Sequence, residues 1–137
     1  MNHFPVLALL MISHACLFSA DPIDVLSKTK WVSDKAETLK WIEQHRPDLA
    51  KSGKFADAFG KMTIEFTKSK VTTHLDGQDY VREQKILGQT AKEIALKTFD
   101  PGLKREVIVV LEIDDNEKGY WIYERQFDVK EHFVPAP

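Results

Sequence analysis

Residues 104–134 constrain the fold of this chain most strongly, because their apolar side chains recur at every second position. The first alternating residues are Val107, Val109, Leu111 and Ile113. After a polar turn come the run from Tyr120 to Tyr123 and then, at even spacing, Phe127, Val129 and Phe133. This period is typical of β-strands packed on a core. Ile108 and Val110 make the first strand apolar on its other face as well, so we expect it to be central and covered on both sides. The sequence therefore predicts that residues 104–134 form the central strands of an antiparallel sheet.

The start of the chain indicates an export signal. Residues 1–20 contain no Asp, Glu, Lys or Arg. Residues 6–12 form an apolar run as long as the core of a signal peptide and too short for a bilayer of ~30 Å. We expect 1–20 to be a removed signal peptide, cut after Ala20, although its first residues offer only His3 where Lys or Arg is usual. An apolar N-terminal helix is the alternative.

Cys16 is the only cysteine, so an internal disulfide is excluded. Its setting resembles the lipidation motif of bacterial lipoproteins, with Ala15 directly before it and Ser13 where Leu is usual. Lipidation at Cys16 and loss of Cys16 with the signal remain alternatives. Both predict an exported protein, periplasmic or secreted, which touches a membrane only through a lipid anchor if it has one.

Two short helices are predicted after a first strand at 29–33. Asp34 and Glu37 stand three residues apart before an apolar-periodic run, which is a capping-box pattern. This helix should end before Pro47. A second helical piece is expected over 48–59, either as one helix or as two short turns. The pair would form a short helical hairpin.

The rest of the chain predicts a β-meander. Asp76 and Gly77 are a strong signal for a two-residue hairpin turn with positive φ at both positions, and Gly88 marks a bend or bulge. Residues 124–128 contain no Gly or Pro, so one bent strand and two strands are both possible there. The expected strands are 62–66, 71–75, 78–87 and 93–99, followed by those of 104–134. The domain organisation is therefore signal 1–20, exposed lead-in 21–28, domain 29–134 and tail 135–137.

Four stretches carry a resemblance to a known group: Lys30-Trp31-Val32-Ser33, Gly60 to Phe66, Gly119 to Tyr123, and Glu131-His132-Phe133. With the order strand, helix pair and meander, the chain resembles fatty-acid-binding proteins of the calycin group and looks like a small bacterial lipocalin-like exported domain. The resemblance implies a mainly β fold. Its meander would form an antiparallel up-and-down barrel or half-barrel of about seven to eight strands, wide enough for one small ligand.

The chain departs from this group at its ligand motif. Thr29 stands where lipocalins usually have the glycine of Gly-x-Trp. Tyr123-Glu124-Arg125 has the reverse order of the Arg-x-Tyr pair that holds a carboxylate in fatty-acid binders. That mode of carboxylate binding therefore does not carry over.

We expect no catalysis, cofactor or metal. The histidines of the mature chain, His45, His74 and His132, lack the spacing of a metal site. Covalent catalysis has no candidate nucleophile. The net charge of −2 with interspersed signs gives no case for nucleic acid.

The candidate ligand-binding residues are Tyr80, Arg82, Trp121 and Tyr123. Tyr80, Arg82 and Gln84 share one face of a strand by period two; that face is either solvated or lines a cavity, since a buried Arg needs a partner. Trp121 and Tyr123 likewise share a face and serve either as core packing or as cavity wall.

Two functions follow from these residues. The first is a non-catalytic exported binding module that holds a small apolar or amphipathic molecule in its barrel. The second is a protein-interaction module of the cell envelope, whose barrel is filled by Met62, Phe66, Trp121 and Phe133. Interior volume distinguishes the two, and an enzyme is the third and least supported class.

Overall fold

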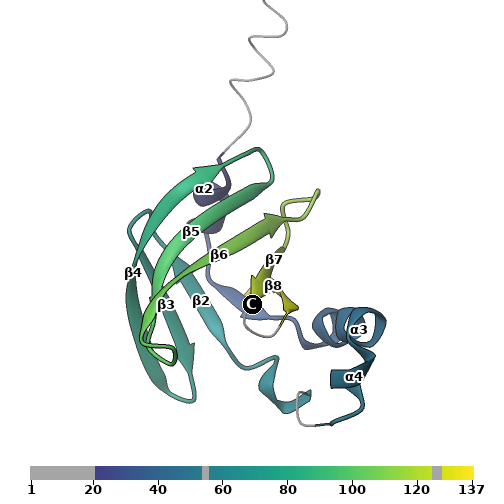
Figure 1. The fold of residues 1–137 in the computed structure, drawn as a ribbon. Coiled ribbons are helices and arrows are strands. Elements are labelled where there is room, and N and C mark those ends of the chain that lie inside the picture. The colour runs from purple at the N-terminus through teal and green to yellow at the C-terminus, as the bar shows by residue number, and fades with distance from the viewer. Residues whose placement is uncertain (1–20, 54–55, 125–127) are drawn as a thin grey trace, which may run out of the picture.

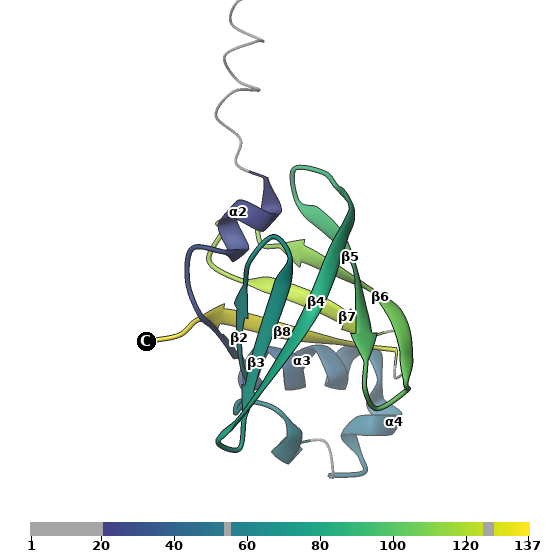
Figure 2. The same cartoon turned by 90° about the vertical axis from the view of Figure 1, so that its left-hand side faces the viewer.

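The computed structural model describes residues 21–53, 56–124 and 128–137. The expected signal peptide, Cys16 and Phe127 lie outside these residues. Eight strands form a closed barrel in which each strand pairs antiparallel with the next (Figures 1 and 2). They are β1 Trp31–Ser33, β2 Thr63–Phe66, β3 Lys70–Leu75, β4 Gln78–Gln89, β5 Glu93–Asp100, β6 Arg105–Ile113, β7 Tyr120–Glu124 and β8 Val129–Pro135.

The barrel closes because β8 pairs with β1, Ser33 lying opposite Phe133 and Trp31 opposite Pro135. The predicted up-and-down barrel is confirmed, and in its closed form. Asp76 and Gly77 both have positive φ, 51° and 76°, as the predicted hairpin turn requires. The register of β4 against β5 shifts between Ile86 and Gly88, which confirms the bulge.

The helices between β1 and β2 begin as predicted. α3 (Lys35–His45) is capped by Asp34, whose side chain accepts a hydrogen bond from the Glu37 amide at 3.3 Å. α4 (Pro47–Ala50) and the 3-10 turn η1 (Ala56–Ala58) are separate short pieces. The two-turn alternative therefore describes this segment, and a continuous second helix is wrong. α3 packs against β8, where the His132 amide donates to Thr38 Oγ1 at 2.9 Å.

The expected exposed lead-in at 21–28 is wrong, because it contains a buried helix. α2 (Pro22–Leu26) places Pro22, Ile23, Val25 and Leu26 in the core and lies at one end of the barrel (Figure 1). The indole nitrogen of Trp31 donates to the Leu26 carbonyl at 2.8 Å. Pro22 fits the first turn of a helix, where its missing N–H costs nothing, and the helix covers apolar surface that the strands alone would leave open.

The interior next to α2 is filled by aromatic rings. Tyr120 contacts Trp31, Phe66 and Phe133, with ring centroids 4.9, 5.7 and 5.2 Å away. All four side chains are buried.

The expectation that β6 is covered on both faces is wrong: Ile108 on its outer face is 45% exposed. A closed barrel has no central strand, and here the outer face of β6 is not covered at Ile108.

Candidate functional site

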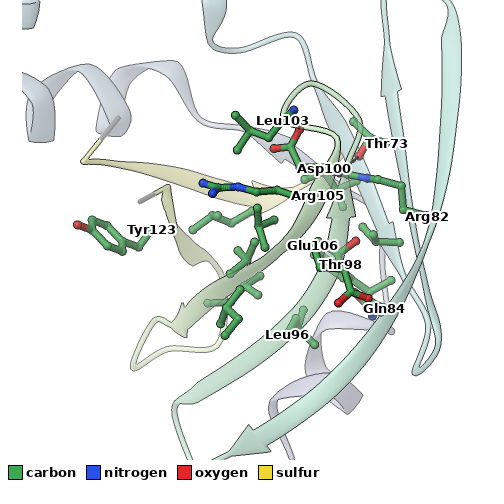
Figure 3. Close-up of a pocket in the computed structure, with 18 of the residues that line it drawn as sticks. Thr73, Arg82, Gln84, Leu96, Thr98, Asp100, Leu103, Arg105, Glu106 and Tyr123 are labelled. Atoms are coloured by element: carbon green, nitrogen blue, oxygen red, sulfur yellow. Dashed lines mark hydrogen bonds between the residues drawn. The ribbon is translucent and has the colours of Figure 1, made fainter. Parts of the chain in front are cut away.

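A cavity of about 630 Å³ occupies the part of the barrel that the aromatic rings do not fill. It is partly open to solvent and lies near the β5–β6 turn, whose residues Asp100, Leu103 and Arg105 line it (Figure 3). Its walls are mainly apolar: Met62, Ile64, Val71, Leu96, Val109, Leu111 and Ile122. This volume falls in the range of roughly 300–1,000 Å³ of small-molecule pockets.

The pleat of β4 decides which of its side chains reach the cavity. Arg82 and Gln84 line it, whereas Val81 and Leu87, on the opposite face, are 61% and 47% exposed. The cavity-lining interpretation of this face therefore describes Arg82 and Gln84. Tyr80 is 47% exposed, does not line the cavity, and donates its hydroxyl to Gln78 Oε1.

Two polar atoms on this face are buried without a hydrogen-bond partner among the described residues, Arg82 Nε and Gln84 Oε1. Gln84 Nε2 donates to the Thr67 carbonyl at 2.7 Å. If the oxygen and nitrogen of this amide exchanged places, the side-chain oxygen would face the carbonyl oxygen and no hydrogen bond could form. Arg82 Nη2 donates a hydrogen bond to Thr73 Oγ1, which is long at 3.4 Å. Leaving such groups unpaired costs about 1–3 kcal/mol each, and a rotation of either side chain toward the cavity would let a ligand meet them.

Asp100, Arg105 and Glu106 supply the other charged groups of the lining, and the sequence analysis missed all three. Asp100 and Arg105 lie opposite each other on β5 and β6, and Glu106 pairs with Lys97. Asp100 Oδ1 accepts hydrogen bonds from the amides of Gly102, at 2.8 Å, and Leu103, at 3.1 Å. Extending the alternation of β6 back from Val107 by two residues would have found Arg105. Neither Arg82 nor Arg105 forms an ion pair with a described residue.

The other two candidate residues do not join this group. Trp121 does not line the cavity; it packs against His132 with ring centroids 4.6 Å apart. Of the two alternatives given for Trp121, core packing or cavity wall, the second is therefore wrong. Tyr123 borders the cavity but stands apart from Arg82 and Gln84 (Figure 3), and its hydroxyl donates to Asp128 Oδ1 at 2.6 Å. Tyr120 and Ile122 take the inner positions of β7, so the period of two was right and the choice of face was wrong.

Two histidines sit between pairs of carboxylates. His132 contacts Asp34 Oδ2 at 3.0 Å through Nδ1 and Asp114 Oδ2 at 2.8 Å through Nε2. On the barrel's outer surface His74 contacts Asp79 and Glu65 in the same manner. In the described part of the chain, no group of His, Cys, Asp and Glu is arranged to hold a metal ion.

The surroundings of His74 predict a pH-dependent stability. Hydrogen bonds to Glu65 and Asp79 raise the pKa of His74 above its usual 6.5. A raised pKa in the folded state stabilises the protein fully below the unfolded value, and this contribution is lost as pH rises through the folded value. We expect the urea midpoint of the wild type to fall relative to that of His74→Gln as the pH increases from about 5.5, which is below the unfolded pKa of histidine, to about 9. Parallel pH profiles would contradict this.

The chain was compared with models of protein families, with curated proteins and with solved structures. Nothing matched. Of the helices in the described residues, none has the length and apolar character needed to cross a membrane. The geometry of the cavity therefore carries the functional argument.

Proposed function

We propose that this protein is a non-catalytic binding module that holds one small amphipathic anion in its barrel. The cavity supports this proposal, because an apolar space of about 630 Å³ lies beside Arg82. Apolar walls bind a hydrocarbon part by removing it from water, at about 25 cal/mol per Å² before the costs of association. A guanidinium at the same cavity orients the charged end.

The alternative, an envelope module that binds a protein partner, has less support. It needs a filled barrel or a free sheet edge, whereas in the described residues each strand of the closed barrel has a neighbour on both sides, which does not favour an added strand. The helices α3 and α4 remain as a surface for a partner. Export through residues 1–20, with or without a lipid at Cys16, belongs to the same proposal, as does the lipocalin-like relationship suggested by the sequence.

Arg82→Ala tests the proposal. We expect it to weaken binding of dodecanoate by about 1–3 kcal/mol, the strength of a charge-assisted hydrogen bond. The neutral analogue dodecanol should bind nearly as before. Isothermal calorimetry is the suitable measurement, because Trp121 lies off the cavity and its emission is a poor reporter.

Lys85→Ala is the matched control, since Lys85 lies on the same strand and is exposed on the outer face. It removes a positive charge without touching the cavity and should leave both affinities unchanged. Equal weakening of dodecanoate and dodecanol by Arg82→Ala would show that Arg82 acts through structure. No saturable binding of dodecanoate, a sterol or an aromatic anion would overturn the proposal and favour the protein-interaction module.

A further inference from the structure

Arg82, Asp100 and Arg105 form one row across the inner faces of β4, β5 and β6. Asp100 pairs directly with Arg105. Gln84 pairs with Thr98 at the end of the ladder between β4 and β5, and Arg82 and Asp100 lie two residues beyond this pair. Arg82 reaches toward Asp100 from β4, whereas the Arg105 side chain extends to the other side, toward Tyr123 (Figure 3). All three residues line the cavity (Figure 3).

This row favours a head group that carries a hydrogen-bond donor over a bare carboxylate. The Arg82 guanidinium attracts an acid, but the Asp100 carboxylate repels it. Asp100 Oδ1 is already engaged by the amides of its own turn, and its second oxygen can accept an N–H or O–H. Gln84, which is only 8% exposed, offers in Oε1 a buried acceptor without a partner among the described residues. A carboxylate, which only accepts hydrogen bonds, satisfies neither.

We propose that the cavity selects an acidic amphiphile whose head group also carries a hydroxyl or amide N–H donor next to the acid, as in a hydroxy fatty acid or an N-acyl amino acid. The inference rests on the proposed function and names its ligand class. The acid pairs with Arg82, the donor bonds to Asp100 or Gln84, and the alkyl chain lies along Leu111 and Ile122. Arg82 and one of the two acceptors then have a partner in the ligand.

The affinities of three probes test this selection: dodecanoate, β-hydroxydodecanoate and decanoylglycine. We expect the wild type to bind the hydroxy acid or the acyl glycine roughly tenfold more tightly than dodecanoate, the effect of one hydrogen bond to a charged group. The difference between these two probes tells which donor, O–H or N–H, fits the row better.

Asp100→Asn identifies the residue responsible. Asparagine keeps the side-chain oxygen that accepts from Gly102 and Leu103 and removes the negative charge. Dodecanoate should bind more tightly to this variant, and the preference for the donor-bearing probes should fall to about twofold or less, because a neutral acceptor is weaker than a carboxylate. Glu83→Gln is the control: Glu83 is exposed on the outer face of β4 and does not line the cavity, and loss of its charge should leave the preference unchanged.

Gln84→Met provides a second test that does not depend on the β5–β6 turn, since it removes the buried acceptor at similar volume. It should also lower the preference. Saturable but equal binding of all three probes to the wild type would overturn this inference and leave the proposed function standing. A preference that survives both variants would also overturn it. Absence of saturable binding by any probe would instead count against the proposed function.

Discussion

Replacing Tyr120 with alanine should destabilise the protein by about 3–5 kcal/mol, the usual cost of removing a fully buried aromatic ring. Tyr120 is 0% exposed and touches the three other rings of the filled half of the barrel. Its removal leaves a void that Trp31 and Phe133, themselves fixed in β1 and β8, cannot close. Urea denaturation followed by circular dichroism measures the loss.

Tyr120→Phe is the matched control and should not destabilise. The Tyr120 hydroxyl is buried without a hydrogen-bond partner among the described residues, so removing it deletes a group that was desolvated at a cost. Burial raises the pKa of Tyr120 well above its usual value of 10.0. The unfolded chain therefore loses this proton first, and stability falls as pH rises above that value. The phenylalanine variant should lack this part of the alkaline loss; a destabilised Tyr120→Phe would show that the hydroxyl has a partner.

The second large effect is expected for His132→Ala. His132 joins the N-cap of α3 to the turn after β6 through Asp34 and Asp114, and its side chain is only 9% exposed. Without the ring, each carboxylate loses a hydrogen-bond partner and Trp121 loses a packing surface. A buried polar group that loses its hydrogen-bond partner costs about 1–3 kcal/mol; for the two carboxylates together we expect about 2–4 kcal/mol, because they keep some contact with water.

His74→Ala repeats the same change on the surface. His74 also lies between two carboxylates, but its side chain is 27% exposed and its partners Glu65 and Asp79 are 48% and 65% exposed. Water can therefore replace the lost contacts, and the loss of stability should be much smaller than for His132. Comparable losses in the two variants, measured by urea denaturation under the same conditions, would show that burial does not set the strength of this arrangement.

Local patterns in the sequence predicted those features of the fold that depend on a few neighbouring residues. The capping of α3 by Asp34, the turn at Asp76-Gly77 and the bulge near Gly88 each depend on neighbouring residues. Closure of the barrel depends on β1 meeting β8, a contact between distant segments that no local pattern specifies. The helix α2 was missed for the same reason: Ile23 and Leu26 are buried only because the open end of the barrel lies against them.

The candidate site was predicted in part. Period two placed Arg82 and Gln84 on one face correctly, since the opposite face of β4 carries Glu83 and Lys85. On β7 both faces offer aromatic or apolar side chains, so the alternation could not tell Tyr120 from Trp121 as the inward residue. The choice was made by the register with β6 and β8, which sets Tyr120 between Ile113 and Phe133.

The pairing of β1 with β8 also bears on how the chain folds. Joining Trp31 to Pro135 closes a loop that contains nearly the whole domain, and such distant contacts are costly in chain entropy and slow to form. The hairpins of β3 to β6 involve near neighbours and can form before this closure. An occupant of the barrel that binds only after its ends have met would stabilise the closed form and slow its opening, so ligand binding and the last step of folding would be thermodynamically linked.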